Sequence, residues 1–221
     1  MTPYYQDDYV TIYHGDCREI VPTLGRFDLL LTDPPYGIGY VHGKGGGCLA
    51  RSTLFAGFAI YGDDEPFDPT WLLALGLPTI LWGANHYADR LPLSRGWLVW
   101  DKRGGMSSND QSDCELAWTN VLTVIRLRTQ VWNGMITSGE QRGKRRVHPT
   151  QKPVELMTWC IGLAGDVHTI LDPFAGSGTT GRAAKDLGRK AVLIEREERY
   201  CEIAAKRMAQ EVFDFGTQER A

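Results

Sequence analysis

Residues Asp33-Pro34-Pro35-Tyr36 place a carboxylate, a rigid turn and an aromatic ring within four positions. Because proline carries no N–H, the carboxylate and a proline carbonyl can together accept both hydrogens of a planar amino group. The ring can stack on the heterocycle that bears this amine. Asp-Pro and Pro-Pro are also common in surface turns, so a second motif is needed before the tetrapeptide indicates a site.

A second motif begins at Asp172 and reads Asp-Pro-Phe-Ala-Gly-Ser-Gly-Thr-Thr-Gly. Its glycines, Gly176, Gly178 and Gly181, match G-x-G-x-x-G, a strand-to-helix turn whose bare backbone can approach a nucleotide. Glu195 follows nineteen residues after Gly176, at the end of another apolar run. An acid at that place can accept hydrogen bonds from both ribose hydroxyls. The two features predict a nucleotide cofactor.

Short apolar runs bounded by polar residues or glycine are the elements that would position these motifs. They predict seven strands, at 9–13, 27–31, 78–82, 97–100, 115–118, 169–171 and 191–194. One helix is expected from about Pro153 to Gly165 and a last helix from about Glu197 to Val212, each with an apolar stripe. The pattern predicts a doubly wound α/β fold with a mainly parallel, seven-stranded sheet.

The position of the glycine turn in the chain separates two kinds of nucleotide-binding fold. A nicotinamide or flavin domain needs several strands after this turn, but only one strand and one helix remain here. The rest of the sheet must therefore come from upstream residues, in a permuted order. This order brings Asp33 to the same crevice as the glycine turn, because the carboxyl ends of neighbouring parallel strands meet there.

The bulk composition sets further bounds. With 221 residues and 43% hydrophobic residues, the chain fits one domain spanning 1–221. A net charge of -3 excludes a globally basic nucleic-acid binder but leaves local basic patches. The five cysteines have no metal-binding spacing, and no apolar run reaches the roughly 18 residues that span a bilayer. We therefore expect a cytoplasmic protein without a metal or a membrane partner.

Four motifs in order resemble those of the amino-methylating DNA methyltransferases of the permuted, or β, class. They are Gly15-Asp16-Cys17, Asp33 to Tyr36, His148-Pro149-Thr150-Gln151-Lys152-Pro153, and Phe174 to Gly178 with Glu195. The resemblance covers nearly the whole chain. It implies a Rossmann-like class I methyltransferase fold, S-adenosylmethionine as the cofactor, and an intracellular enzyme encoded by a bacterium or a phage.

The same resemblance implies roles for individual residues. Asp16 would contact the cofactor adenine, Glu195 the ribose and Lys152 the cofactor carboxylate; the alternatives are a helix cap for Asp16 and a solvated charge for Lys152. Cys17 is best explained as a small buried side chain. The full predicted cofactor-binding set is Asp16, Cys17, Asp33, Lys152, Asp172, Phe174, Gly176, Ser177, Gly178, Thr179 and Glu195. The predicted catalytic set is Asp33, Pro34, Pro35 and Tyr36.

The reaction implied is methyl transfer to the N6 amino group of an adenine flipped out of double-stranded DNA. Asp33 would orient the amine, because a neutral aromatic amine is too weak an acid for a carboxylate to deprotonate. N4-cytosine methylation is the nearest alternative, and the resemblance associates Asp at this position mostly with adenine. Methylation of protein or RNA amines, or a non-catalytic nucleotide-binding module, are more distant alternatives.

Contacts to DNA are expected from two segments. Lys44 lies in a glycine-rich stretch, and Arg142, Lys144, Arg145 and Arg146 could neutralise phosphates or simply be solvated. Members of the family that the chain resembles commonly insert a sizeable target-recognition domain before His148, whereas only residues 120–147 are available here, which implies a reduced recognition region. A homodimer could supply further DNA contacts, and a restriction endonuclease partner is compatible with the resemblance. The recognition sequence and the roles of Asn85, Asp101 and Lys102 are left open.

Overall fold

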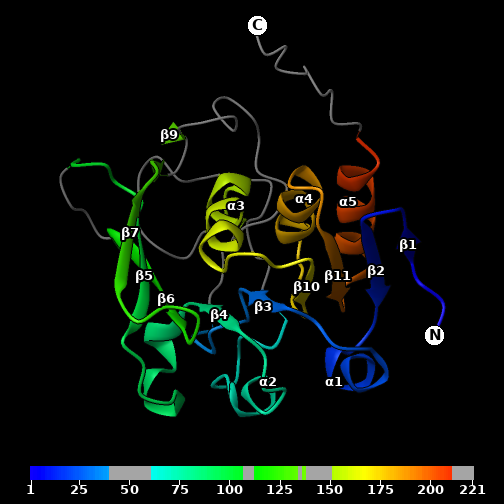
Figure 1. Cartoon of the computed structure of the whole chain (residues 1–221), viewed down its shortest axis with the longest axis horizontal. Coiled ribbons are helices and arrows are strands. Elements are labelled where there is room, and N and C mark those ends of the chain that lie inside the picture. The colour runs from blue at the N-terminus through cyan, green and yellow to red at the C-terminus, as the bar shows by residue number, and fades with distance from the viewer. Residues whose placement is uncertain (40–60, 107–111, 134–135, 138–150, 211–221) are drawn as a thin grey trace, which may run out of the picture.

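The computed structural model describes residues 1–39, 61–106, 112–133, 136–137 and 151–210. A nine-stranded sheet runs through the described chain in the order β1-β2-β11-β10-β3-β4-β6-β5-β7 (Figure 1). Its strands are β1 (Tyr5–Gln6), β2 (Val10–His14), β3 (Leu29–Thr32), β4 (Thr79–Trp82), β5 (Gly96–Asp101), β6 (Cys114–Thr119), β7 (Ile125–Thr129), β10 (Thr169–Asp172) and β11 (Lys190–Glu195). A separate hairpin joins β8 (Trp132–Asn133) and β9 (Ile136–Thr137).

The seven predicted strands correspond to β2, β3, β4, β5, β6, β10 and β11. Strands β2, β11, β10, β3 and β4 pair in parallel, and β6 is antiparallel to both of its neighbours. The prediction of a mainly parallel α/β sheet is confirmed. The edge strands β1 and β7 were not predicted. Strand β1 has only two residues, and Ile125 and Leu127 of β7 are exposed, so neither strand has the run of buried apolar residues that marks a strand in the sequence.

Helices cover both faces of the sheet (Figure 1). On one face lie α3 (Val154–Leu163), α4 (Thr179–Asp186) and α5 (Glu198–Met208), and on the other α1 (Cys17–Ile20) and α2 (Thr70–Leu73). Each face of the sheet has its own hydrophobic core, and successive side chains of a strand point into them alternately. Leu29 and Leu31 pack with α3 to α5, and Leu30 packs with α1 and α2. Sheet alternation with a period of two therefore builds two apolar layers from one strand.

The two predicted helices are α3 and α5. Helix α3 begins at Val154 after Pro153, and Gly165 just beyond its end has a φ of +81°, the left-handed conformation that stops helices. Helix α5 ends at Met208, before the predicted Val212, which lies outside the described residues. In the part of the chain that the structure describes, no helix has the length and apolarity needed to cross a membrane.

The permuted order is confirmed by the pairing of β10 with both β3 and β11. Ile170 lies opposite Leu29 and Leu171 opposite Leu30, so the two strands end side by side. Asp33 follows β3, while Asp172 ends β10 and Glu195 ends β11. The carboxylates of the two predicted motifs thus gather at one edge of the sheet.

Candidate active site

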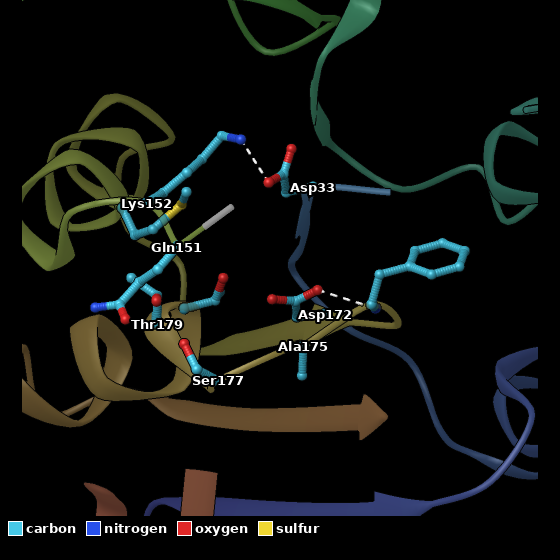
Figure 2. Close-up of a pocket in the computed structure, with 10 residues that line it drawn as sticks. Asp33, Gln151, Lys152, Asp172, Ala175, Ser177 and Thr179 are labelled. Atoms are coloured by element: carbon cyan, nitrogen blue, oxygen red, sulfur yellow. Dashed lines mark hydrogen bonds and ion pairs between the residues drawn. The ribbon is translucent and has the colours of Figure 1, made fainter. Parts of the chain in front are cut away.

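Asp33 extends from the buried strand β3 toward Lys152 of the segment before α3 (Figure 2). Its Oδ2 lies 2.5 Å from the Lys152 Nζ, and its Oδ1 accepts a 2.6 Å hydrogen bond from the Tyr36 hydroxyl. The side chain is 21% exposed. Burial raises the pKa of the Asp33 carboxyl, the Lys152 charge lowers it and the Glu115 charge raises it again, so that the pKa is above its ordinary value. Both oxygens are thus held in a fixed orientation.

The ring of Tyr36 is packed against two neighbours. It stacks on His86, with 4.8 Å between ring centroids and 13° between planes. Gly83 has a φ of +71°, and a Cβ there would clash with the Tyr36 ring at Cε1, so only glycine allows this approach. Because burial raises the Tyr36 pKa well above its usual range, the hydroxyl stays protonated and able to donate to Asp33.

The backbone after Tyr36 is fixed by Asp63, which the sequence motifs did not indicate. The Asp63 Oδ1 accepts hydrogen bonds from the backbone N–H groups of Tyr36 and Gly37, each at 2.8 Å. The Asp63 carbonyl accepts another from the Gly39 N–H at 2.6 Å. Asp63 is 2% exposed and 27 residues from Tyr36 along the chain, so no local pattern could have paired them.

Lys152 faces the catalytic motif. Its side chain is 5% exposed, and its Nζ lies 3.1 Å from the Glu115 Oε2 and donates to the Tyr36 hydroxyl oxygen at 3.0 Å. Burial lowers the pKa of the ammonium, but the charges of Asp33 and Glu115 raise it above its ordinary value. Two protein carboxylates thus pair with this ammonium, and the predicted contact with a cofactor carboxylate stays a prediction. Lys152 is not a solvated charge, the alternative considered from sequence.

The glycine turn is tied to Glu195. The Glu195 Oε2 accepts from the Gly176 N–H at 2.7 Å and its Oε1 from the Glu197 N–H at 2.8 Å. Burial raises the Glu195 pKa and these backbone donors oppose the rise. Gly178 caps α4 with a φ of +76°, and a Cβ there would lie 2.8 Å from the Ala204 Cβ. Each Glu195 oxygen keeps a lone pair for a further donor, such as a ribose hydroxyl.

A pocket between the two motifs contains much of the predicted set. It is lined by Asp33, Gln151, Lys152, Met157, Asp172, Phe174, Ala175, Ser177, Thr179 and Thr180 (Figure 2). Asp172 is 3% exposed and accepts at Oδ1 from the Thr32 hydroxyl (2.6 Å) and the Phe174 N–H (3.1 Å). Burial raises its pKa to about 6. Among the described residues no cation is paired with this carboxyl.

Asp16 and Cys17 lie outside that lining. The Asp16 Oδ1 caps α1 by accepting from the Arg18 N–H at 2.9 Å, as the helix-cap alternative expected, and its Oδ2 lies 3.3 Å from Arg196. Cys17 is buried, and burial raises its thiol pKa to about 12, so the side chain is neutral core. The segment still borders the site, because the Gly15 N–H donates to the Glu195 carbonyl at 3.0 Å.

The predicted DNA-contacting residues cannot be placed in this geometry. Lys44, Arg142, Lys144, Arg145 and Arg146 all lie outside the described residues. Asp101, Lys102 and Asn85 are described: Asp101 accepts from the N–H groups of Arg103 and Gly104, Lys102 pairs with Glu115, and Asn85 is exposed within the short helix η2 (Ala84–His86).

The sheet order and the carboxylates at its edge define a class I methyltransferase fold, and solved structures share it. The M1.HpyAVI–SAM complex superposes with a TM-score of 0.55 at 22% identity, covering 90% of this chain and 99% of that one. PvuII DNA methyltransferase, which is cytosine-N4-specific, gives 0.60 at 15% identity, covering 95% and 89%.

Sequence comparisons narrow the class to one family. Residues 124–206 match the DNA methylase family model of N6 and N4 methyltransferases. The type II methyltransferase M2.DpnII of Streptococcus pneumoniae is 45% identical over 254 residues, covering 95% of this chain and 93% of that protein. M2.LlaDCHI of Lactococcus lactis subsp. cremoris is 26% identical over 250 residues, covering 93% and 91%. The chain belongs to the family of DNA amino-methyltransferases, which use S-adenosylmethionine.

Proposed function

We propose that the enzyme methylates the N6 amino group of adenine in double-stranded DNA. The observation that carries this proposal is the fixed carboxylate of Asp33 at the end of β3, held by Lys152 at 2.5 Å and by Tyr36 at 2.6 Å. An acceptor oriented before the substrate arrives needs little reorganisation as charge develops on the reacting amine.

The exocyclic amine of a base is a poor nucleophile, because its lone pair is delocalised into the ring. Asp33 and the carbonyl of Pro34 would accept its two hydrogens and so localise that pair on nitrogen. S-adenosylmethionine, when bound, supplies an electrophilic methyl group on a sulfonium. Asp33 orients the amine and does not deprotonate it before transfer, because its pKa lies far below that of an aromatic amine.

The cofactor would be held by the glycine turn and the carboxylates around it. Glu195 has lone pairs for the ribose hydroxyls, and Asp172 offers a carboxyl whose ionised form a positive charge would stabilise. Phe174, Ser177 and Thr179 line the same pocket. The contact of Asp16 with the cofactor adenine stays a prediction, and in the structure its carboxylate caps α1 and pairs with Arg196.

The preference for adenine over cytosine rests on Asp33 as the first residue of the catalytic motif. The target base would be flipped into the site and stack on Tyr36. Since His86 covers one face of that ring, a base must use another face or displace the imidazole. Beyond the site, phosphate contacts by Lys44 and by Arg142, Lys144, Arg145 and Arg146 stay predictions, as do a single domain spanning 1–221, a reduced recognition region at 120–147, a homodimer and a restriction endonuclease partner.

The test is incubation of the purified protein with isotope-labelled S-adenosylmethionine and unmethylated genomic DNA, followed by mass spectrometry of the nucleosides. Labelled N6-methyladenine is expected. Labelled N4-methylcytosine alone would show that the target base is cytosine and not adenine. Absence of both products would refute the proposed DNA substrate.

A further inference from the structure

Glu115 is a half-buried carboxylate next to the catalytic motif, and no sequence motif indicated it. It lies near the start of β6, and its side chain is 25% exposed. Its Oε2 lies 3.1 Å from the Lys152 Nζ, and its Oε1 lies 3.0 Å from the Lys102 Nζ. Glu115 therefore connects two lysines from different parts of the chain.

Four charges alternate across the site in a row that we name the charge chain: Lys102, Glu115, Lys152 and Asp33. Their side chains come from the end of β5, from β6, from the segment before α3 and from the end of β3. The three contacts measure 3.0, 3.1 and 2.5 Å, so neighbours are in direct contact and the formal charges cancel. The charge chain thus links the partly accessible Lys102 to Asp33, the predicted catalytic carboxylate.

Sharing matters because Lys152 is buried. An ammonium with one carboxylate partner would direct its whole attraction at Asp33 and reduce what Asp33 can offer to another donor. A second carboxylate divides that attraction. Although burial opposes ionisation, Lys152 and Lys102 lower the pKa of Glu115 to about 2, so Glu115 carries its charge at any working pH.

We propose that Glu115 is a positioning residue for methyl transfer: by sharing the Lys152 ammonium, it keeps Asp33 oriented and available to the target amine, while Lys102 fixes Glu115. This inference rests on the proposed role of Asp33 as amine acceptor. It holds for adenine and for cytosine alike, because either exocyclic amine presents the same two hydrogens.

Every charged group near Asp33 bears on a titration test. Lys152 and Tyr36 contact it directly, Glu115 acts through Lys152, and Asp172 and Tyr87 interact with it at longer range. Glu115 and Lys102 can be changed without altering a direct contact of Asp33. They carry opposite charges, so a charge chain makes opposite predictions for the two.

The first experiment measures the pH midpoint of the Asp33 side-chain carboxyl by ¹³C NMR in the cofactor-free protein. Glu115→Gln is expected to lower the midpoint by about one pH unit, and Lys102→Met to raise it by about half a unit. Asp113→Asn is the matched control, because Asp113 lies just before β6 but pairs with Arg103. In this control variant, the pH midpoint of the Asp33 carboxyl should equal that of the wild type.

Shifts of the same sign in the two variants, or no shift in Lys102→Met, would overturn the inference. Since Lys102 is near the surface, with 18% of its side chain exposed, this variant decides the question even if Glu115→Gln does not fold. The measurement needs no DNA, so a negative result would refute the role of Glu115 without refuting the proposed function. The proposed function is tested separately, by nucleoside analysis with the wild type.

The second experiment measures single-turnover methyl transfer with saturating S-adenosylmethionine. Glu115→Gln should slow transfer about tenfold while cofactor affinity stays within twofold. In a Lys152→Met background the same substitution should have little further effect, because residues that act through one group are not additive. An equal tenfold loss in both backgrounds would show that Glu115 does not act through Lys152.

Discussion

Replacing Asp172 by asparagine tests whether the pocket holds a carboxyl whose pKa the fold raises. Asp172 ends β10 with 3% exposure, and its Oδ1 accepts hydrogen bonds from Thr32 and Phe174. An asparagine oxygen can accept both bonds, and the hydroxyl of Thr180, which also bonds this carboxyl, can accept from the amide, so the substitution mainly removes the ionisable group. The difference between the two proteins therefore isolates the titration of this carboxyl.

The magnitude follows from the rise of its pKa from 3.8 to about 6 on folding. The folded state then binds the proton more tightly than the unfolded state, so the stability of the wild type falls as pH rises from about 4 to about 6. A rise of this size corresponds to about 3 kcal/mol in full, of which about 2 kcal/mol is lost between about pH 4.5 and 7.5.

The assay is urea unfolding of the cofactor-free wild type and Asp172→Asn at several pH values in that range. The variant should gain about 2 kcal/mol relative to the wild type between about pH 4.5 and 7.5. At about pH 7.5 the same variant should bind S-adenosylmethionine more weakly, because a positive ligand favours the ionised carboxyl. A stability difference that stays constant with pH would refute the reasoning.

Three further substitutions test the supports of the site. Gly83→Ala should slow methyl transfer at least about tenfold, because its Cβ would meet the Tyr36 ring at a φ of +71°; Gly25→Ala, with no atom within 4 Å of its Cβ, is the kinetic control. Asp63→Ala should cost about 1–3 kcal/mol in urea unfolding, since the N–H groups of Tyr36 and Gly37 lose their acceptor, and normal stability would contradict this. Glu195→Gln should weaken cofactor binding about tenfold by calorimetry while leaving transfer at saturation nearly unchanged; a rate defect without a binding defect would place Glu195 elsewhere.

The sequence could predict the edge of the sheet where the site lies. Strands β3, β10 and β11 are short apolar runs, and each is followed or ended by an acid, namely Asp33, Asp172 and Glu195. Because parallel strands end at the same edge, the chain order alone brought these acids together. The glycine turn and helix α4 were also predictable from neighbouring residues, since Gly178 caps α4 in a left-handed conformation that glycine favours.

The contacts between distant segments could not be predicted in the same way. Glu115 meets Lys152 only because β6 enters the sheet antiparallel between β4 and β5, which its apolar pattern does not encode. The protein partners of Lys152, namely Asp33 and Glu115, were also not evident from its own motif. Asp63 likewise bonds Tyr36 from 27 positions away along the chain, whereas the Asp16 cap is local and the sequence offers it as an alternative.

The measurement that tests the central claim most directly is single-turnover methyl transfer to DNA by Asp33→Ala at saturating S-adenosylmethionine. Loss of the fixed acceptor should lower the rate at least about a hundredfold, while cofactor affinity stays within about threefold of the wild type. A variant that transfers methyl groups within about threefold of the wild-type rate would contradict the assignment of Asp33 as the acceptor for the target amine.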